Sequence, residues 1–256
     1  MKVGLIQALD SSSISDYQVK YFWQPCIDSV KEWAQRCGYG YHFYNSSILT
    51  NVQQRLGIKW QHPKTKEIQW NKFAWLRQQA ENYDLLMWVD ADTLVWGQPN
   101  LFLRKSDLTK FNFLNGSLVF SRYETSWTNV VTPIFWCPSS LLIEIDDWIN
   151  LMLDSPESRS DLFKTIMICS ERFKIDFSIE MALSALYYEK KEKFNLIDRD
   201  EELGNEWYTT YKSTDRLLKK DSLIHFDGDN KFRYKQRVDA YRAYLAYEEG
   251  RHIWIK

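Results

Sequence analysis

The feature that most constrains the fold is the six-residue run 84–89, DLLMWV, which is followed directly by Asp90-Ala91-Asp92. The last five residues of this run are all apolar. A short, uninterrupted apolar run is typical of a strand that is buried on both faces of an α/β sheet. In such sheets, ligands bind outside the carboxyl ends of the strands. The sequence therefore predicts a central strand whose end presents two carboxylates to a binding site.

The rest of the chain supplies the other elements of an α/β domain. Apolar residues recur at helical spacing between residues 18 and 36, and Gly38 is a plausible stop for that helix. Strand and helix alternate over the first 90 residues or so, which favours an α/β sandwich. The predicted strands are 2–9, 39–44, 84–89, 111–121, 130–137 and 223–226, and the predicted helices are 18–36, 71–82, 141–153, 178–189 and 234–249.

Composition narrows the class of protein. The chain of 256 residues has 33 basic and 34 acidic residues, so its net charge of -1 gives no overall attraction to nucleic acid. No segment approaches the roughly 20 apolar residues that span a bilayer. The N-terminus lacks the features of a signal peptide, so we expect a cytoplasmic protein. None of the four cysteines forms a CxxC pair, which argues against a zinc knuckle.

The carboxylate pair Asp90 and Asp92 has a chemical interpretation of its own. Two buried, unpaired carboxylates are costly, and a cation between them compensates for that cost. Hard divalent cations such as Mg²⁺ and Mn²⁺ prefer oxygen ligands of this kind. The alternative is a polar loop in which the aspartates form a turn or cap a helix. The position of the pair behind an apolar strand favours the metal site.

A second candidate motif lies near the C-terminus, where His225, Gly228 and Lys231 form the pattern HxxGxxK. Imidazole can ligate a divalent metal, glycine lets the backbone approach a phosphate, and lysine neutralises phosphate charge. The alternatives are a structural histidine and a polar turn formed by Asp227 and Asp229.

Together these motifs resemble the GT-A glycosyltransferases, in particular family 8 and its relatives. The resemblance rests on Trp70-Asn71-Lys72, on residues 82–95 (NYDLLMWVDADTLV) and on the later HxxGxxK. It implies a single-domain, Rossmann-like α/β/α sandwich with a mixed central sheet. Residues 1–256 would form this one domain, with 1–100 as the nucleotide-binding half ending in DxD. Residues 101–256 would form the acceptor-binding half and the C-terminal metal and phosphate loop.

The resemblance also implies roles for individual residues. Asp90, Asp92 and His225 correspond to the metal ligands. Asp176 and Glu180, at a predicted helix start, correspond to an acidic pair near the reacting sugar. The residues that would bind the donor, from its base to its diphosphate, are Asp10, Tyr17, Lys72, Asp90, Gly228 and Lys231.

Simpler alternatives remain for some of these residues. Lys72 could be a solvated lysine on a helix surface. Asp10 and Tyr17 could cap a helix or pack in the core, and Ser178 or Asp176 could cap the helix that begins there.

The function that the resemblance implies is metal-dependent transfer of a sugar from a nucleotide donor, such as a UDP-sugar, to a glycan or other hydroxyl acceptor, with retention of configuration. Mn²⁺ or Mg²⁺ would be the cofactor. Two alternatives stay open. One is a haloacid dehalogenase-type phosphohydrolase with Asp90 as nucleophile, in which Gly228-Asp229-Asn230 would match a later acidic motif. The other is a non-catalytic carbohydrate-binding protein, which the 12 Trp would suit.

Overall fold

A computed structural model describes residues 1–9, 16, 19–99, 108–115, 130–197, 208–211 and 222–226. The strands are β1 (Val3–Ala8), β2 (Gly40–Tyr44), β3 (Leu85–Val89), β4 (Thr93–Trp96), β5 (Phe111–Asn115), β6 (Val130–Pro138), β7 (Phe194–Ile197), β8 (Tyr208–Tyr211) and β9 (Ser222–Phe226). The α-helices are α2 (Gln24–Arg36), α3 (Val52–Leu56), α4 (Pro63–Arg77), α5 (Ser139–Asp154), α6 (Asp161–Arg172) and α7 (Ile179–Glu189). A π-helical stretch, Val19–Trp23, leads into α2.

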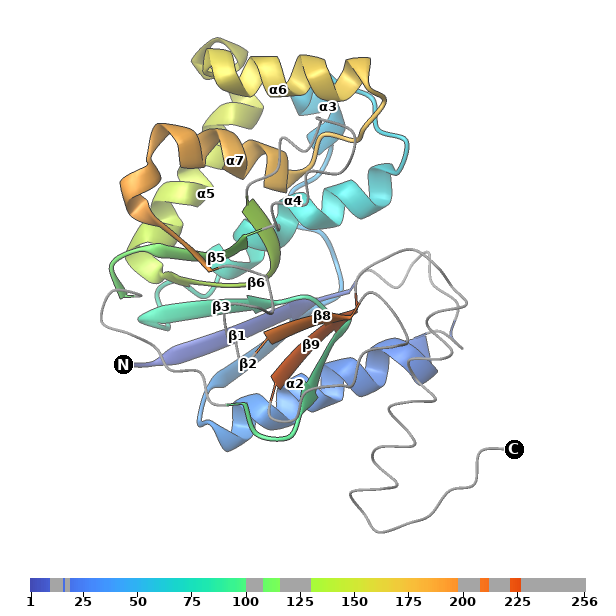
Figure 1. The fold of residues 1–256 in the computed structure, drawn as a ribbon, viewed down its shortest axis with the longest axis vertical. Helices are drawn as coiled ribbons and strands as arrows, with labels where there is room; N and C mark the ends of the chain where they lie inside the picture. The colour runs from blue at the N-terminus through green and yellow to red at the C-terminus, as the bar shows by residue number, and fades with distance from the viewer. Residues whose placement is uncertain are drawn as a thin grey trace.

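Six of the strands form a mixed sheet in the order β2-β1-β3-β6-β5-β7 (Figure 1). The strands β2, β1 and β3 are parallel, β6 runs antiparallel to both β3 and β5, and β7 is parallel to β5. A smaller sheet has the order β4-β9-β8. Its strand β4 follows β3 after only three residues, so the small sheet begins at the carboxyl end of the central strand.

The central strand β3 separates two hydrophobic clusters. Leu86 and Trp88 pack in the cluster beneath α4, α5 and α7, whereas Leu85, Met87 and Val89 pack in the cluster beneath α2. Figure 1 shows α2 on one face of the large sheet and α4, α5 and α7 on the other. Every residue of β3 is at most 1% exposed. The predicted strand with two buried faces is therefore confirmed, because each face is covered by helices.

Tyr83, just before β3, explains two glycines in the neighbouring strands. A Cβ atom on Gly4 would lie 2.7 Å from Cδ2 of Tyr83, and one on Gly40 would lie 2.6 Å from its Cε1. The phenol oxygen of Tyr83 is also 2.8 Å from Nε2 of His42 in β2. The tyrosine ring thus lies across β1 and β2 in space that only glycine leaves open.

Gly40→Ala is expected to lower the free energy of unfolding by about 1–3 kcal/mol, the range for overpacking. Strand propensity alone would favour alanine over glycine, so a loss of stability identifies the clash with the Tyr83 ring as the cause. Urea unfolding of the full chain measures the change. In a Tyr83→Leu background the same substitution should cost much less, and an equal cost in both backgrounds would contradict this explanation.

Most predicted elements are confirmed to within a few residues, and one required correction. The helix predicted at 71–82 is α4, which begins eight residues earlier, at Pro63, and ends at Arg77. Proline suits the first turn of a helix because no intrahelical partner for its missing N–H is needed there. Residues 78–82 form turns instead. The predicted strand 111–121 ends at Asn115 as far as it is described, and the predicted helix 234–249 lies outside the described residues.

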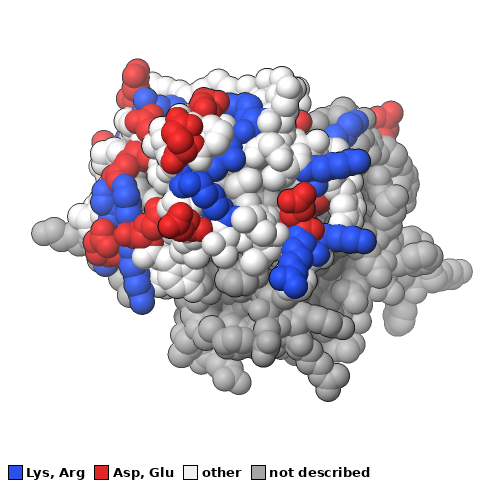
Figure 2. All heavy atoms as spheres, turned by 90° about the horizontal axis from the view of Figure 1, so that it is seen from above, with Lys and Arg blue, Asp and Glu red and all other residues white. Residues whose placement is uncertain are grey.

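The surface of the helical layer carries charges of both signs. Figure 2 views the molecule from above in Figure 1, from the end where α6 and α3 lie. Acidic and basic side chains are interspersed across the described surface on this side. No described helix combines the length and the apolar composition that crossing a bilayer requires.

Candidate metal centre

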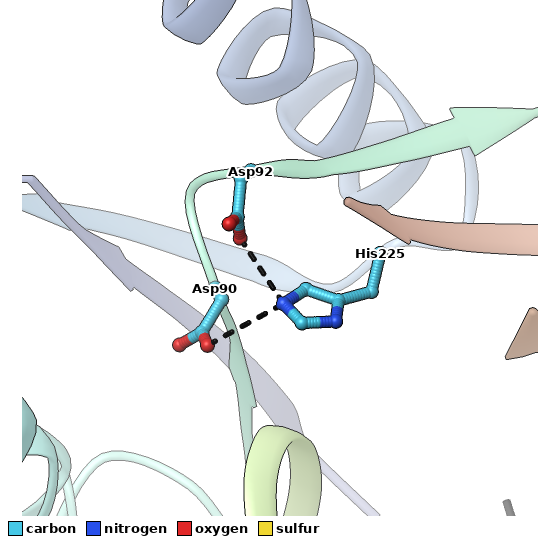
Figure 3. Close-up of side chains that lie close together, drawn as sticks. All are labelled: Asp90, Asp92 and His225. Atoms are coloured by element: carbon cyan, nitrogen blue, oxygen red, sulfur yellow. Dashed lines mark ion pairs between the residues drawn. The ribbon is translucent and has the colours of Figure 1, made fainter. Parts of the chain in front are cut away.

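Three potential metal ligands meet where the two sheets join. Asp90 follows β3, Asp92 precedes β4, and His225 lies in β9. One ligand atom from each lies within 4.8 Å of the others. Nε2 of His225 is 3.4 Å from Oδ1 of Asp92 and 3.9 Å from Oδ2 of Asp90 (Figure 3). The structure thus brings together side chains from distant parts of the sequence, and we call these three residues the triad.

Strand pairing explains how the triad forms. In the antiparallel pair β4–β9, Thr93 lies opposite His225, so the histidine is adjacent to Asp92. The amide of Thr93 donates to the carbonyl of Asp90 at 3.0 Å, which closes a tight turn between β3 and β4. This turn places both aspartates at the end of the central strand. Because His225 is only 8% exposed, its ring is held within the fold.

The protein fixes the carboxylate of Asp90 from one side. Its Oδ1 accepts from Nζ of Lys72 at 2.7 Å and from Nε1 of Trp88 at 2.5 Å. Its amide donates to the carbonyl of Pro133, and its carbonyl accepts from Nε2 of Gln7. One oxygen is therefore held by protein donors, while Oδ2 is turned toward His225 (Figure 3).

The electrostatics of Asp90 favour an added cation. Burial raises the pKa of its carboxyl above the ordinary value, and the neighbouring Asp92 raises it further. Lys72 and His225 act in the opposite direction without fully compensating. A divalent cation between the carboxylates would supply the missing positive charge, since it stabilises their ionised forms. Two carboxylate oxygens and an imidazole nitrogen form a donor set that suits such an ion.

Lys72 is buried, which rules out the solvated alternative considered from sequence. The residue is 4% exposed, and its ammonium also donates to the carbonyl of Thr132 at 2.7 Å and to Oγ1 of Thr132 at 3.1 Å. The nitrogen lies 5.3 Å from the centre of the Trp88 ring. Its three hydrogens are thus matched by three protein oxygens. Contact between Lys72 and a donor stays a prediction.

The structure separates the predicted acidic pair. Oε1 of Glu180, in α7, accepts from the amide of Thr132 at 2.9 Å and from its hydroxyl at 3.1 Å, so Glu180 connects to Lys72. Asp176 instead accepts from the amides of Gln61 at 2.5 Å and His62 at 2.9 Å, just before α4 begins. Helix α4 rises about 15 Å over the ten residues from His62 to Lys72. Asp176 therefore lies beside the start of α4, at the end away from Lys72. The residue that caps α7 is Ser178, whose hydroxyl accepts from the amide of Met181 at 3.4 Å.

Asp176→Ala is expected to lower the free energy of unfolding by about 1–2 kcal/mol, because the amides of Gln61 and His62 lose their charged acceptor. Burial would raise the pKa of Asp176, but the hydrogen bonds from Gln61 and His62 outweigh it and lower the pKa. The stabilisation is therefore present above the ordinary pKa of about 4 and lost as pH falls through the lowered value.

Urea unfolding of Asp176→Ala and wild type between pH 7 and pH 2 tests this prediction. The difference in stability should shrink in acid, while metal binding at pH 7 stays unchanged. A loss of metal binding with unchanged stability would contradict this explanation and would favour the predicted position of Asp176 near the reacting sugar.

Four residues of the predicted donor site lie outside the described residues: Asp10, Tyr17, Gly228 and Lys231. Their roles stay predictions. Sequence reasoning missed two residues that the structure places around the triad, Thr132 and Trp88. The side-chain periodicity of β3 puts Trp88 on the same face as Lys72, and this could have been deduced once α4 was assigned to that face. Thr132 carries no local signal.

No protein-family model and no curated protein sequence matches the chain. Among solved structures, a glycosyltransferase involved in glycosylation of the major capsid of PBCV-1 is similar, with a TM-score of 0.59 at 10% identity over 94% of this chain and 100% of that one. The chain has the GT-A fold. The predicted fold class is therefore confirmed, including the mixed central sheet covered on both faces.

Two further GT-A enzymes are similar at lower scores. Mouse xyloside xylosyltransferase 1 has a TM-score of 0.49 at 9% identity, covering 89% of this chain and 98% of that one. A mutant of Drosophila β1,4-galactosyltransferase 7, in complex with manganese, UDP-Gal and xylobiose, has a TM-score of 0.40 at 9% identity, covering 93% and 79%.

Proposed function

We propose that the protein is a metal-dependent glycosyltransferase that moves a sugar from a UDP-sugar to a glycan or other hydroxyl acceptor, with retention of configuration. One observation carries this proposal: Asp90, Asp92 and His225 converge at the carboxyl end of the central strand in a GT-A sheet. Ligands of open α/β sheets bind at this end. Mn²⁺ is the preferred ion because the donor set mixes carboxylate oxygen with imidazole nitrogen.

The chemistry assigned to the site follows from its charges. Breaking the bond between the sugar and the diphosphate builds negative charge on the leaving group, and a bound divalent ion stabilises such charge as a Lewis acid. Asp92 and His225 would hold the ion directly, and Asp90 would present Oδ2 to it. Lys231 would add a fixed positive charge beside the diphosphate, and Gly228 would let the backbone approach it. Asp10 or Tyr17 would contact the base.

The fold weighs against the phosphohydrolase alternative. In haloacid dehalogenase-type enzymes the acidic strand usually lies near the N-terminus, whereas here β1 and β2 precede the strand that ends in Asp90. In addition, Oδ1 of Asp90 is bound by Lys72 and Trp88, which orients the carboxylate toward His225. Glycan binding that needs no metal, together with no binding of a nucleotide sugar, would favour the carbohydrate-binding alternative.

Release of UDP from a panel of UDP-sugars tests the proposal directly. The full chain is incubated with UDP-glucose, UDP-galactose, UDP-N-acetylglucosamine or UDP-xylose, with Mn²⁺ or with EDTA, and water serves as the acceptor of the sugar. An aryl phosphate serves as the phosphatase substrate. We expect UDP release from at least one donor with Mn²⁺ and none with EDTA. Release of phosphate from the aryl substrate, with no donor cleaved, would overturn the proposal in favour of a phosphohydrolase.

A further inference from the structure

A continuous series of hydrogen bonds joins α7 to the carboxylate of Asp90. Oε1 of Glu180 accepts from the hydroxyl of Thr132 at 3.1 Å, and the same hydroxyl oxygen accepts from Nζ of Lys72 at 3.1 Å. Nζ of Lys72 is in turn 2.7 Å from Oδ1 of Asp90. The backbone of Thr132 adds a second hydrogen bond to each of its two partners: its amide donates to Glu180, and its carbonyl accepts from Lys72. We call these four residues the relay.

The relay is buried where it passes through the fold. Thr132 is 0% exposed and Lys72 is 4% exposed. A buried ammonium is costly unless its hydrogens find acceptors, and a buried hydroxyl needs a partner as well. Lysine also has a long, flexible side chain, so its position depends on the groups that bind its nitrogen. Thr132 supplies two of the three acceptors for that nitrogen, and Glu180 fixes the rotamer of the threonine hydroxyl.

The charges of the relay and the triad together suit one divalent ion. The carboxylates of Glu180, Asp90 and Asp92 and the ammonium of Lys72 carry a net formal charge of −2. Lys72 alone balances only one of these carboxylates. One divalent cation would bring the group to neutrality, as a partly buried site requires.

We propose that Glu180 and Thr132 are positioning residues for the metal ion: they hold Lys72 against Oδ1 of Asp90 and so keep Oδ2 turned toward His225. In the hydrogen bonds described, both residues reach Asp90 through Lys72. This inference rests on the proposed metal site and deepens it, since it gives Glu180 a role different from contact with the reacting sugar. Groups that orient a metal ligand commonly change metal affinity by 10- to 100-fold.

The test is calorimetric titration of Mn²⁺ into the full chain and its variants. Glu180→Leu removes, at similar volume, the oxygen that accepts both hydrogen bonds from Thr132, and Thr132→Val removes the hydroxyl while keeping the shape. Glu180 reaches the ligand Asp90 only through Thr132 and Lys72. We therefore expect about a tenfold weaker Mn²⁺ affinity for each variant, which is the lower end of the 10- to 100-fold range. The double variant should lose about tenfold and not a hundredfold, since both changes interrupt one series of bonds. Glu180→Gln keeps an acceptor and should stay within about threefold of wild type.

Glu144→Leu provides a matched control. Glu144, on α5, also binds two protein groups, the ammonium groups of Lys190 and Lys193, but it lies outside the relay. This variant should bind Mn²⁺ as wild type does. Melting temperatures of all variants separate loss of affinity from loss of structure. Thr132→Val should disturb the structure less than Glu180→Leu. If Glu180→Leu unfolds, the Mn²⁺ affinity of Thr132→Val therefore tests the relay.

The outcomes distinguish failure of the relay from failure of the proposed function. Wild type that binds Mn²⁺ through Asp92, combined with unchanged affinity in Glu180→Leu and Thr132→Val, would overturn the relay alone. A hundredfold loss in the double variant would also overturn it, because independent effects multiply. Wild type that binds no Mn²⁺ would overturn both.

Discussion

Asp92→Ala is expected to abolish Mn²⁺ binding and sugar transfer while leaving the free energy of unfolding within about 1 kcal/mol of wild type. The substitution removes one of three protein ligands, and Asp90 and His225 alone cannot enclose the ion. The fold should tolerate the change, because removal of Asp92 also relieves its repulsion of the buried Asp90 carboxylate. The loss should therefore appear in binding and turnover and not in stability.

Calorimetric titration with Mn²⁺ and UDP release measure this effect, and urea unfolding measures the stability. Asp147→Ala is the matched control, since Asp147 is an exposed aspartate on α5. It should leave metal binding and UDP release unchanged. Metal-dependent UDP release that survives in Asp92→Ala would show that the triad is not the metal centre.

Lys72→Met is expected to lower the free energy of unfolding by about 2–3 kcal/mol. Removal of one partner from a fully buried ion pair costs about 3–5 kcal/mol, because the remaining charge loses its counter-charge. The side chain of Lys72 is 5% exposed, whereas that of Asp90 is 26% exposed, so water screens part of the cost. Saturating Mn²⁺ should raise the stability of both proteins, and that of Lys72→Met by less, because the variant has lost the group that orients Asp90 toward the ion.

Urea unfolding with and without Mn²⁺ measures both effects. Lys64→Met is the control: it removes an exposed lysine of the same helix. This variant should change stability by less than about 0.5 kcal/mol. Equal destabilisation by the two substitutions would contradict the special role of Lys72.

The sequence allowed prediction of those parts of the site that depend on local pattern. The apolar run before Asp90 predicts a strand buried on both faces, and the position of Asp90 and Asp92 at its end follows from chain order. The strand at 223–226 was also predicted, but its partner β4 was not. The four residues Thr93–Trp96 follow the preceding strand so closely that they read as part of its loop. That pairing is what places His225 beside Asp92.

Parts that depend on long-range contact could not be predicted. The segment Asp176 to Glu180 reads equally well as a helix cap and as an acidic pair at a site. Ser178 turns out to be the cap, whereas the place of the Asp176 carboxylate depends on Gln61 and His62, which lie more than a hundred residues away in sequence. Thr132 joins the relay because β6 runs antiparallel beside β3 and continues past its end. The start of α4 was missed because residues 63–69 are mostly polar and lack helical periodicity of apolar residues.

The most direct test of the proposed metal and donor site is calorimetric titration of the full chain with UDP, at saturating Mn²⁺ and again in EDTA. We expect UDP to bind in the presence of Mn²⁺, and to bind at least tenfold more weakly in EDTA, because the ion would join the diphosphate to the triad. Equal affinity for UDP under both conditions would contradict a metal-dependent donor site, and no binding under either condition would contradict a UDP-sugar donor.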